Sequence, residues 1–250
     1  MKKIISILLS FLGFFWRFIP LFLRDFFLRG LLALESTGKN EKVFKRLFAH
    51  KKFISKLINS RAVELNNGIH PKHHLTKYHN FFIENINKDI QSVLDIGSGN
   101  GFVAHEIAKK FDKIEVVGID RNKYNIENST QNFNLSNLKF IEGDVLYYKF
   151  EKNFDVVILS NILEHIDQRT KFLKKLISQT NPKLLFIRVP LFERDWEIPF
   201  KKKLNINYFT DDEHFIEHSI QEFKEEMNKS NLKISKLLTI WGEIWCVCET

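Results

Sequence analysis

The segment Val93-Leu-Asp-Ile-Gly-Ser-Gly-Asn-Gly101 decides the fold of this chain. Its first four residues have the apolar character of a short buried strand, and Gly97, Gly99 and Gly101 place a tight turn directly after it. From Phe102 to Phe111, apolar residues recur at the spacing of one helical face. A strand, a glycine-rich turn and a helix in this order are typical of a nucleotide-binding α/β unit.

The spacing of the glycines indicates which nucleotide binds. A dinucleotide site needs Gly-x-Gly-x-x-Gly, so that the pyrophosphate can lie on the helix N-terminus. This chain has Gly-x-Gly-x-Gly, which argues against a dehydrogenase, and Asp95 precedes the turn. A carboxylate at this position would repel a pyrophosphate but would suit an ammonium or sulfonium ion. The sequence therefore predicts a nucleotide ligand that carries a positive charge.

Two further carboxylates follow predicted strands. Asp120 ends the apolar run from Glu115, and Asp144 follows the run that begins at Phe140. An acidic residue at the tip of the second strand accepts hydrogen bonds from ribose hydroxyls in such sites. Each aspartate alone also fits a helix cap or a strand end. Together with Asp95, they favour one ligand site. We interpret Arg121 as a solvated neighbour, and the alternative is contact with a phosphorylated ribose.

With these motifs, the chain resembles class I S-adenosylmethionine (SAM) dependent methyltransferases from about Tyr78 to its C-terminus. The run Phe154 to Ile166 is similar to the family's fourth strand and following loop, in the Leu-Glu-His form common among small-molecule methyltransferases. In this family the third aspartate typically faces the adenine amino group, and the next apolar residue lies on the ring. The resemblance implies SAM as cofactor, bound by Asp95, Gly97, Gly99, Gly101, Asp120, Asp144, Val145 and Asn161.

The remaining pattern predicts the fold class as α/β. We expect a Rossmann-like seven-stranded, mostly parallel sheet with helices on both faces, an antiparallel final strand and an N-terminal helical extension. The later elements are helices over 169–179 and 220–230 and strands over 184–189, 232–240 and 243–248. Cys246 and Cys248 share one face of the last strand, which is poor geometry for a disulfide, so we expect buried free thiols.

Three positions are candidates for the acceptor side. His165 follows the fourth strand and is the candidate catalytic base; the alternative is that it orients the loop. Trp196 and His214 belong to the long stretch between the fifth strand and the next helix, where this fold usually inserts its substrate loop. His214 and His218 are spaced to share a helical face, and the alternative is a helix start with solvated charges.

The segment Gly68 to His79 is rich in histidine, with His70, His73, His74 and His79. No cysteine is near and the spacing matches no standard zinc pattern, so we expect no metal. Relatives in the resembled family often use this segment to cover the methionine end of SAM. The resemblance thus assigns Tyr78 to the substrate side, with Lys72 or Lys77 as a partner for the methionine carboxylate.

The basic residues gather toward the N-terminus. Residues 1–77 hold 15 Lys or Arg and 4 Asp or Glu, a net charge of +11, whereas residues 78–250 hold 23 and 26, a net charge of −3. A nucleic-acid methyltransferase more often carries positive charge around its catalytic cleft. We therefore expect no nucleic-acid partner.

Residues 1–38 are predicted to form an amphipathic helix that binds a membrane surface. At helical spacing Lys3, Ser6, Ser10, Gly13, Arg17, Pro20 and Arg24 fall on one stripe, and the other directions are apolar. No convincing cleavage site marks a signal peptide. The alternatives are a lid packed on the catalytic domain, or a spanning helix interrupted by Arg17 and Pro20. Residues 39–77 are a basic helical linker or lid suited to anionic lipids, and residues 78–250 are the methyltransferase domain.

The sequence thus predicts a SAM-dependent methyltransferase that is cytoplasmic and peripheral to the inner face of the cytoplasmic membrane. The expected reaction is O-methylation of a glycan or a lipid-linked sugar, because parts of the chain are similar to methyltransferases associated with surface-polysaccharide synthesis. The alternatives are methylation of a lipid or quinone head group, and a SAM-binding membrane scaffold without catalysis. The acceptor, the atom methylated and the oligomeric state stay open.

Overall fold

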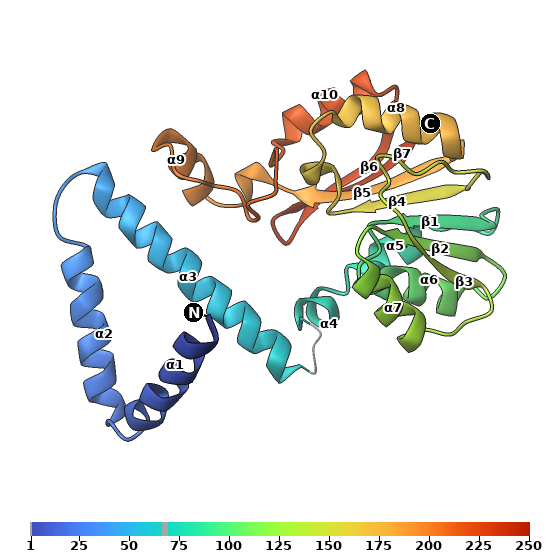
Figure 1. Ribbon diagram of the computed structural model, residues 1–250. Helices are drawn as coiled ribbons and strands as arrows, with labels where there is room; N and C mark the ends of the chain where they lie inside the picture. Colours follow the sequence, from blue (N-terminus) through green and yellow to red (C-terminus); the bar gives the residue numbers. More distant parts are fainter. Residues whose placement is uncertain (1, 67–69) are drawn as a thin grey trace. The chain divides into compact units, whose positions relative to one another are not determined.

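The computed structural model describes residues 2–66 and 70–250 and forms two compact units, Met1–Pro71 and Lys72–Thr250 (Figure 1). The side chains of residues 2–6, 73 and 74 lie outside the described part of the chain. The contributions expected from Lys3 and Ser6 to the cationic stripe, and from His73 and His74 to the histidine-rich segment, therefore fall outside the described side chains.

The N-terminal unit contains the helices α1 (Lys2–Trp16), α2 (Leu21–Glu35) and α3 (Glu41–Leu65). The single helix predicted over 1–38 is wrong, because α1 ends at Trp16 and a second helix begins after Pro20, which is the N-cap of α2. Proline lacks the N–H of a helix interior and disfavours helical geometry in the residue before it. Arg46 of α3 donates to the carbonyl oxygen of Glu35 at 2.9 Å, which joins α3 to the end of α2.

The apolar residues of α1 and α2 lie largely at the surface, and Phe18, Leu21 and Phe22 are each more than 70% exposed. Within the described residues, no helix combines the length and the apolar character needed to cross a bilayer.

The second unit is built on a seven-stranded sheet in the order β3-β2-β1-β4-β5-β7-β6. Only β7 runs against its neighbours β5 and β6, as predicted for the final strand. The strands are β1 (Ser92–Ile96), β2 (Glu115–Asp120), β3 (Leu138–Glu142), β4 (Val156–Ser160), β5 (Leu184–Pro190), β6 (Lys233–Ile240) and β7 (Glu243–Glu249).

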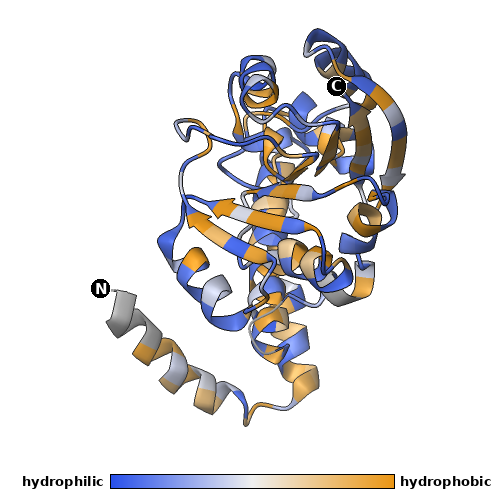
Figure 2. Ribbon diagram, turned by 90° about the vertical axis from the view of Figure 1, so that its right-hand side faces the viewer, coloured by the Kyte–Doolittle hydropathy of each residue, from blue (hydrophilic) through white to orange (hydrophobic). Residues whose placement is uncertain are grey.

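Helices cover both faces of this sheet (Figure 1). One face carries α5 (His79–Asn85), α6 (Phe102–Lys110) and α7 (Lys123–Asn132), and the other carries α8 (Arg169–Thr180) and α10 (Ile220–Lys229). The central strands β4 and β5 are mostly hydrophobic because they are buried on both faces, and Figure 2 shows hydrophobic stretches along strands of the sheet. Shorter helical segments are α4 (Lys72–Thr76), η1 (Leu163–His165), η2 (Phe192–Arg194) and α9 (Glu197–Lys203).

The strand order reverses between β1 and β4, which are paired neighbours although β2 and β3 separate them in the chain. In open α/β sheets, ligands bind outside the carboxyl ends of the strands at such a switch point. The glycine turn after β1 and the Leu-Glu-His loop after β4 therefore meet at this edge.

The cysteine pair of β7 and the segment from His214 to His218 were both predicted from their spacing. The Sγ atoms of Cys246 and Cys248 lie 3.5 Å apart as buried free thiols. The helical face proposed for His214 and His218 is wrong, because the chain is irregular there and α10 begins at Ile220. His218 is fully buried and its Nε2 lies 3.2 Å from Oε1 of Glu226, whereas the His214 ring packs against His165.

Candidate active site

The glycine turn after β1 places backbone without side chains at the edge of the sheet between β1 and β4. Gly97, Gly99 and Gly101 all have positive φ values, of 66°, 53° and 76°. A Cβ on Gly97 would lie 2.0 Å from Cδ1 of Ile162, and one on Gly101 would lie 2.5 Å from the Phe140 ring. A Cβ on Gly99 would meet no atom within 4 Å, so this glycine borders open space. Gly97 and Gly101 are needed for packing, and Gly99 leaves room for a ligand.

Asp95 lies at the end of β1 with 1% of its surface exposed, and its Oδ2 has no hydrogen-bond partner in the described structure. Burial raises the pKa of this carboxyl to about 7, and the nearby charge of Asp120 raises it further. A buried carboxylate oxygen without a donor is costly unless a cation or a hydrogen-bond donor reaches it. The site is therefore matched to a positively charged ligand.

Asp120 at the end of β2 is held in a fixed orientation. Its Oδ2 accepts a hydrogen bond from the Gly99 N–H at 2.9 Å, and its Oδ1 accepts one from the Asn122 N–H at 2.8 Å. Oδ1 also accepts a longer hydrogen bond from Nδ2 of Asn125 at 3.4 Å, and a carboxylate has about four acceptor positions in all, so it can accept more. Asp120 is thus oriented to accept hydrogen bonds from two neighbouring hydroxyl groups, as a ribose presents them.

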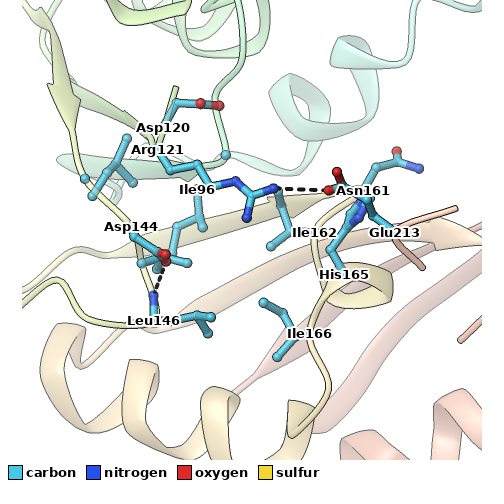
Figure 3. Close-up of a pocket in the computed structure, with 14 residues that line it drawn as sticks. Ile96, Asp120, Arg121, Asp144, Leu146, Asn161, Ile162, His165, Ile166 and Glu213 are labelled. Atoms are coloured by element: carbon cyan, nitrogen blue, oxygen red, sulfur yellow. Dashed lines mark hydrogen bonds and ion pairs between the residues drawn. The ribbon is translucent and has the colours of Figure 1, made fainter. Parts of the chain in front are cut away.

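A cavity of about 210 Å³ lies beside Asp120 (Figure 3). Its wall includes the predicted residues Gly97, Asp120, Asp144, Val145, Asn161 and His165, whereas Asp95, Gly99 and Gly101 belong to the strand end and turn next to it. Oδ1 of Asp144 accepts a hydrogen bond from the Leu146 N–H at 2.9 Å, which fixes the loop that forms the far wall. The remaining lining residues are Ile96, Ile119, Arg121, Gly143, Leu146, Ile162, Ile166 and Glu213.

Arg121 connects two walls of the cavity. Its Nη2 lies 3.1 Å from Oε2 of Glu213, in the loop before α10, and both side chains are well exposed. Figure 3 shows the guanidinium extending from the Asp120 side toward Glu213. The sequence predicted only a solvated neighbour at Arg121, and it missed Glu213 because nothing local marks that residue among the charges of 211–213.

Asn161 and Arg188 hold the ends of β4 and β5 together. Asn161 has a positive φ of 58°, and its N–H donates to the carbonyl oxygen of Arg188 at 2.7 Å. The Arg188 Nε donates to Oδ1 of Asn161 at 2.7 Å and lies 3.4 Å from Oε2 of Glu243. Arg188 was not predicted as a site residue, although a charged residue inside the apolar run Leu184–Pro190 is a visible signal.

Tyr78, a predicted substrate residue, packs against this arginine. The guanidinium of Arg188 lies 3.9 Å from the centre of the Tyr78 ring, and Tyr78 is 7% exposed. Burial raises the pKa of Tyr78 to about 12, so the phenol stays neutral. Burial also lowers the pKa of Lys72, and the charge of Arg188 contributes to this lowering, which places Lys72 in the same region. The segment before β1 therefore contributes to this side of the site.

Glu164, His165 and His214 form a cluster at the edge of the cavity. The first two belong to η1, and the ring centres of His165 and His214 are 4.5 Å apart. Glu164 is fully buried, which raises the pKa of its carboxyl to about 7. Burial lowers the pKa of His165, and His214 contributes to this lowering. The sequence predicted His165 and His214 separately, but it did not predict that they meet or that Glu164 joins them.

Trp196 does not belong to this constellation. It is 69% exposed, and its ring packs on Phe200 of α9 at 5.8 Å. It does not line the cavity beside Asp120. Its role toward a substrate stays a prediction that the cavity does not support.

The arrangement defines a nucleotide-binding α/β domain in which one buried carboxylate oxygen, Oδ2 of Asp95, lacks a hydrogen-bond partner, and the comparisons identify its family. Residues 87–245 match the model of a family described as a methyltransferase domain, and the chain belongs to this family. Its cofactor is SAM, which supplies an electrophilic methyl group on a sulfonium ion.

Among curated proteins, the chain is 28% identical over 209 residues to an (S)-coclaurine N-methyltransferase of Papaver somniferum, a match that covers 64% of this chain and 59% of that protein. It is 34% identical over 104 residues to an (S)-tetrahydroprotoberberine N-methyltransferase of Eschscholzia californica, covering 40% and 30% of the two chains. The chain thus spans less than two thirds of the length of these relatives.

Solved structures share the fold. Magnesium protoporphyrin IX methyltransferase from Synechocystis PCC 6803 with bound SAH has a TM-score of 0.56 and 14% identity, covering 71% of this chain and 82% of that chain. Coclaurine N-methyltransferase bound to N-methylheliamine and SAH has a TM-score of 0.52 and 19% identity, covering 66% and 51%. At these identities the likeness shows a Rossmann-like methyltransferase fold.

The residues present fit SAM. The unpartnered Oδ2 of Asp95 would face the positively charged methionine end, and the oriented carboxylate of Asp120 would bind the ribose hydroxyls. Gly99 leaves the space between them clear of side-chain atoms. Asp144 and Val145 line the part of the cavity that would take the adenine.

We predict that SAM binds more tightly as the pH rises from 6 to 8. Below its pKa of about 7, Asp95 is largely protonated in the free protein. A cationic ligand favours the carboxylate, so binding releases a proton there, and affinity rises by up to about one log unit per pH unit before levelling off. Calorimetric titration at several pH values measures this dependence.

Asp95→Asn isolates this effect from the titration of the ligand's own α-amino group. The variant should bind SAM more weakly at pH 8 and should lose the part of the pH dependence that Asp95 contributes. An identical pH profile in the variant and the parent protein would show that Asp95 does not titrate on binding.

Proposed function

We propose that this chain transfers the methyl group of SAM to a hydroxyl or amine group of a small-molecule acceptor held at Glu164, His165 and His214. The observation that carries this proposal is the cluster itself. It lies at the rim of the cofactor cavity, where His165 is part of the wall, and it offers hydrogen-bond acceptors. Neither oxygen of the Glu164 carboxylate has a hydrogen-bond partner in the described structure. An incoming group that brings a proton would satisfy these atoms.

The first acceptor class is the hydroxyl of a glycan or a lipid-linked sugar. Its support in the sequence is the likeness of two segments, 188–196 and 70–73, to methyltransferases associated with surface-polysaccharide synthesis. Aromatic side chains next to the cluster add to this support, because Phe209 lies 6.4 Å from the His214 ring and packs on Tyr208 at 4.5 Å. Rings of this kind provide apolar surfaces on which a sugar can lie.

The second acceptor class is a small amine, and the curated relatives favour it. Those reported above are named as N-methyltransferases of alkaloids. The acidic residues Asp211 and Glu213 lie near His165 and would attract a protonated amine. An amine and a sugar therefore need to be tested side by side.

The test is an acceptor screen with the full chain and SAM that carries an isotopically labelled methyl group. Nucleotide sugars, lipid-linked sugars and small secondary amines are incubated in parallel, and label transfer is read by mass spectrometry. The variant His214→Gln should lower kcat by about 100-fold or more, because misplacing the reacting group by about 1 Å has an effect of this size. SAM affinity should stay unchanged, since His214 does not line the cofactor cavity.

The matched control is His50→Gln, which removes a half-exposed histidine of α3 in the other unit. It should leave turnover unchanged. Label transfer to no acceptor by protein that binds SAM would contradict the proposal and would favour a SAM-binding scaffold. Equal losses in His214→Gln and His50→Gln would exclude a specific role for the cluster.

We further propose that the N-terminal unit binds the inner face of the cytoplasmic membrane through α1 and α2. Its support is the set of exposed apolar residues on these helices, including Phe11, Phe22 and Phe26 at 61%, 71% and 70% exposure. The net charge of +11 over residues 1–77 complements an anionic bilayer. Amphipathic helices with these features lie in the bilayer interface.

Co-sedimentation with vesicles tests this proposal. The full chain should bind vesicles that contain phosphatidylglycerol at least tenfold more tightly than neutral phosphatidylcholine vesicles, because each basic residue near the surface contributes about 1 kcal/mol. The double substitution Phe22→Glu and Phe26→Glu should abolish binding, and Phe53→Glu on α3, also exposed, should have a smaller effect. Equal sedimentation of all three proteins would overturn the membrane proposal.

A further inference from the structure

Three side chains from distant parts of the chain converge next to the cofactor cavity. Glu164 and His165 follow β4, and His214 comes from the loop before α10. Each offers one ligand atom, and these atoms lie within 4.8 Å of one another. The Phe215 N–H donates to the carbonyl oxygen of Glu164 at 2.8 Å, which fastens the two segments together. The juxtaposition is therefore held by the backbone.

The carboxylate in this cluster lacks the partners that its burial demands. Glu164 has 0% exposure, and neither of its oxygens has a hydrogen-bond partner in the described structure. A buried carboxyl group is costly unless it is hydrogen-bonded, paired with a cation or coordinated to a metal. No Lys or Arg forms an ion pair with it among the described salt bridges, and its neighbours are the imidazoles of His165 and His214 together with the side chain of Asn161.

The imidazole of His214 is oriented by the side chains of Glu217 and Thr210. Nδ1 of His214 lies 3.6 Å from Oε1 of Glu217 and 3.3 Å from Oγ1 of Thr210. Glu217 is itself buried and bound by Arg194. A carboxylate behind a histidine fixes the tautomer that presents Nε2, as behind histidines that ligate metals.

We propose that Glu164, His165 and His214 bind a divalent first-row transition-metal ion such as Zn²⁺, Mn²⁺ or Co²⁺. Two imidazoles and one carboxylate match the ligand preferences of these ions, whereas Mg²⁺ and Ca²⁺ prefer oxygen ligands. Ligands about 2.0–2.2 Å from one ion lie at most about 4.4 Å apart, so small side-chain rotations close the site. This site is distinct from the histidine-rich segment 68–79, for which the sequence predicted no metal.

A bound ion would specify how the acceptor is held for methyl transfer, and this part of the inference rests on the proposed function. Three protein ligands leave a coordination position open, and His165 also lines the cofactor cavity. The open position would bind the hydroxyl oxygen of the acceptor and lower the pKa of that hydroxyl, so that its proton would pass to water and not to His165, which would be a ligand. The oxygen would then form a bond to the methyl carbon of SAM as the bond between sulfur and that carbon breaks and S-adenosylhomocysteine leaves. A cation at this site would repel a protonated amine. The metal proposal therefore favours the hydroxyl of a sugar over an amine as the acceptor.

Cobalt provides a test that does not depend on turnover. Co²⁺ is titrated into the full chain in a background with His70, His73 and His74 changed to Gln, and its visible absorption bands report coordination by imidazole. We expect one bound Co²⁺ per chain. Each of His214→Gln and Glu164→Gln should weaken Co²⁺ binding by more than the roughly 10–100-fold seen on losing a supporting residue behind a ligand. His50→Gln should change nothing.

Absent bands in the folded background protein, or bands unchanged by both substitutions, would overturn the metal site. Glu164→Gln and His214→Gln each put a polar side chain in place of a polar one, and circular dichroism should show both variants folded. Methyl transfer that continues undiminished after chelation and dialysis would overturn the role of the ion and leave the proposed function standing. Bound Co²⁺ without methyl transfer to any acceptor would contradict the proposed function and leave the metal site standing.

Discussion

Replacing Asp120 with Ala is expected to weaken SAM binding by about 100-fold or more. A hydrogen bond to a charged group contributes about 1.5–3 kcal/mol, and two ribose hydroxyls would lose such an acceptor. The substitution also releases the amides of Gly99 and Asn122, which the carboxylate holds at 2.9 and 2.8 Å. The glycine turn would therefore lose its orientation together with its acceptor. Calorimetric titration of SAM measures the loss directly.

Asp112→Ala is the matched control. Asp112 is an exposed aspartate in the turn between α6 and β2, away from the cavity. Its replacement should leave SAM affinity unchanged. If Asp120→Ala and Asp112→Ala bound SAM equally well, the nucleotide would have to occupy another part of the molecule.

Gly101→Ala should lower the free energy of unfolding by roughly 2–5 kcal/mol. A left-handed backbone costs an L-residue about 1–2 kcal/mol, and overpacking adds typically about 1–3 kcal/mol. Both penalties apply, because φ is 76° and the new Cβ would lie 2.5 Å from the Phe140 ring and 2.8 Å from Cβ of Ser129. Urea unfolding followed by circular dichroism measures the change.

Gly99→Ala separates packing from ligand binding. Its φ of 53° carries a similar backbone cost of about 1–2 kcal/mol, but its Cβ would enter open space. The variant should therefore be more stable than Gly101→Ala, and it should still bind SAM poorly, because the methyl group occupies the ligand's side of the turn. Tight SAM binding by Gly99→Ala would show that the cofactor does not approach this glycine.

Much of the fold was predictable because it rests on local patterns. The apolar run before Gly97 could only be a buried strand, and the helical spacing after Gly101 marked α6. The two-residue alternation of Cys246 and Cys248 placed both thiols on one face. The break at Pro20 was less accessible, since periodicity continues through it and only backbone sterics separate α1 from α2.

Some residues of the candidate site also have a local sequence signal, and others do not. Asp95, Asp120 and Asp144 could be predicted because each lies at or just after the end of its own strand, and parallel strands end at one edge. Arg188 was marked by its charge inside an apolar strand, but nothing local indicated that it would meet Asn161. Glu213 could not be predicted, since its role depends on Arg121, which is far away in the chain. A charge in a loop has no local signature for the residue that it will meet.

The sequence by itself determined the nucleotide-binding unit and its preference for a cationic ligand, because strand, turn and acidic residue lie within nine consecutive positions. Only the tertiary structure decided what stands at the acceptor side. His214 reaches His165 because an irregular loop, and not the expected helix, is fastened to Glu164 through the Phe215 amide. Long-range backbone pairing brings these side chains together, and no periodicity in the chain encodes it.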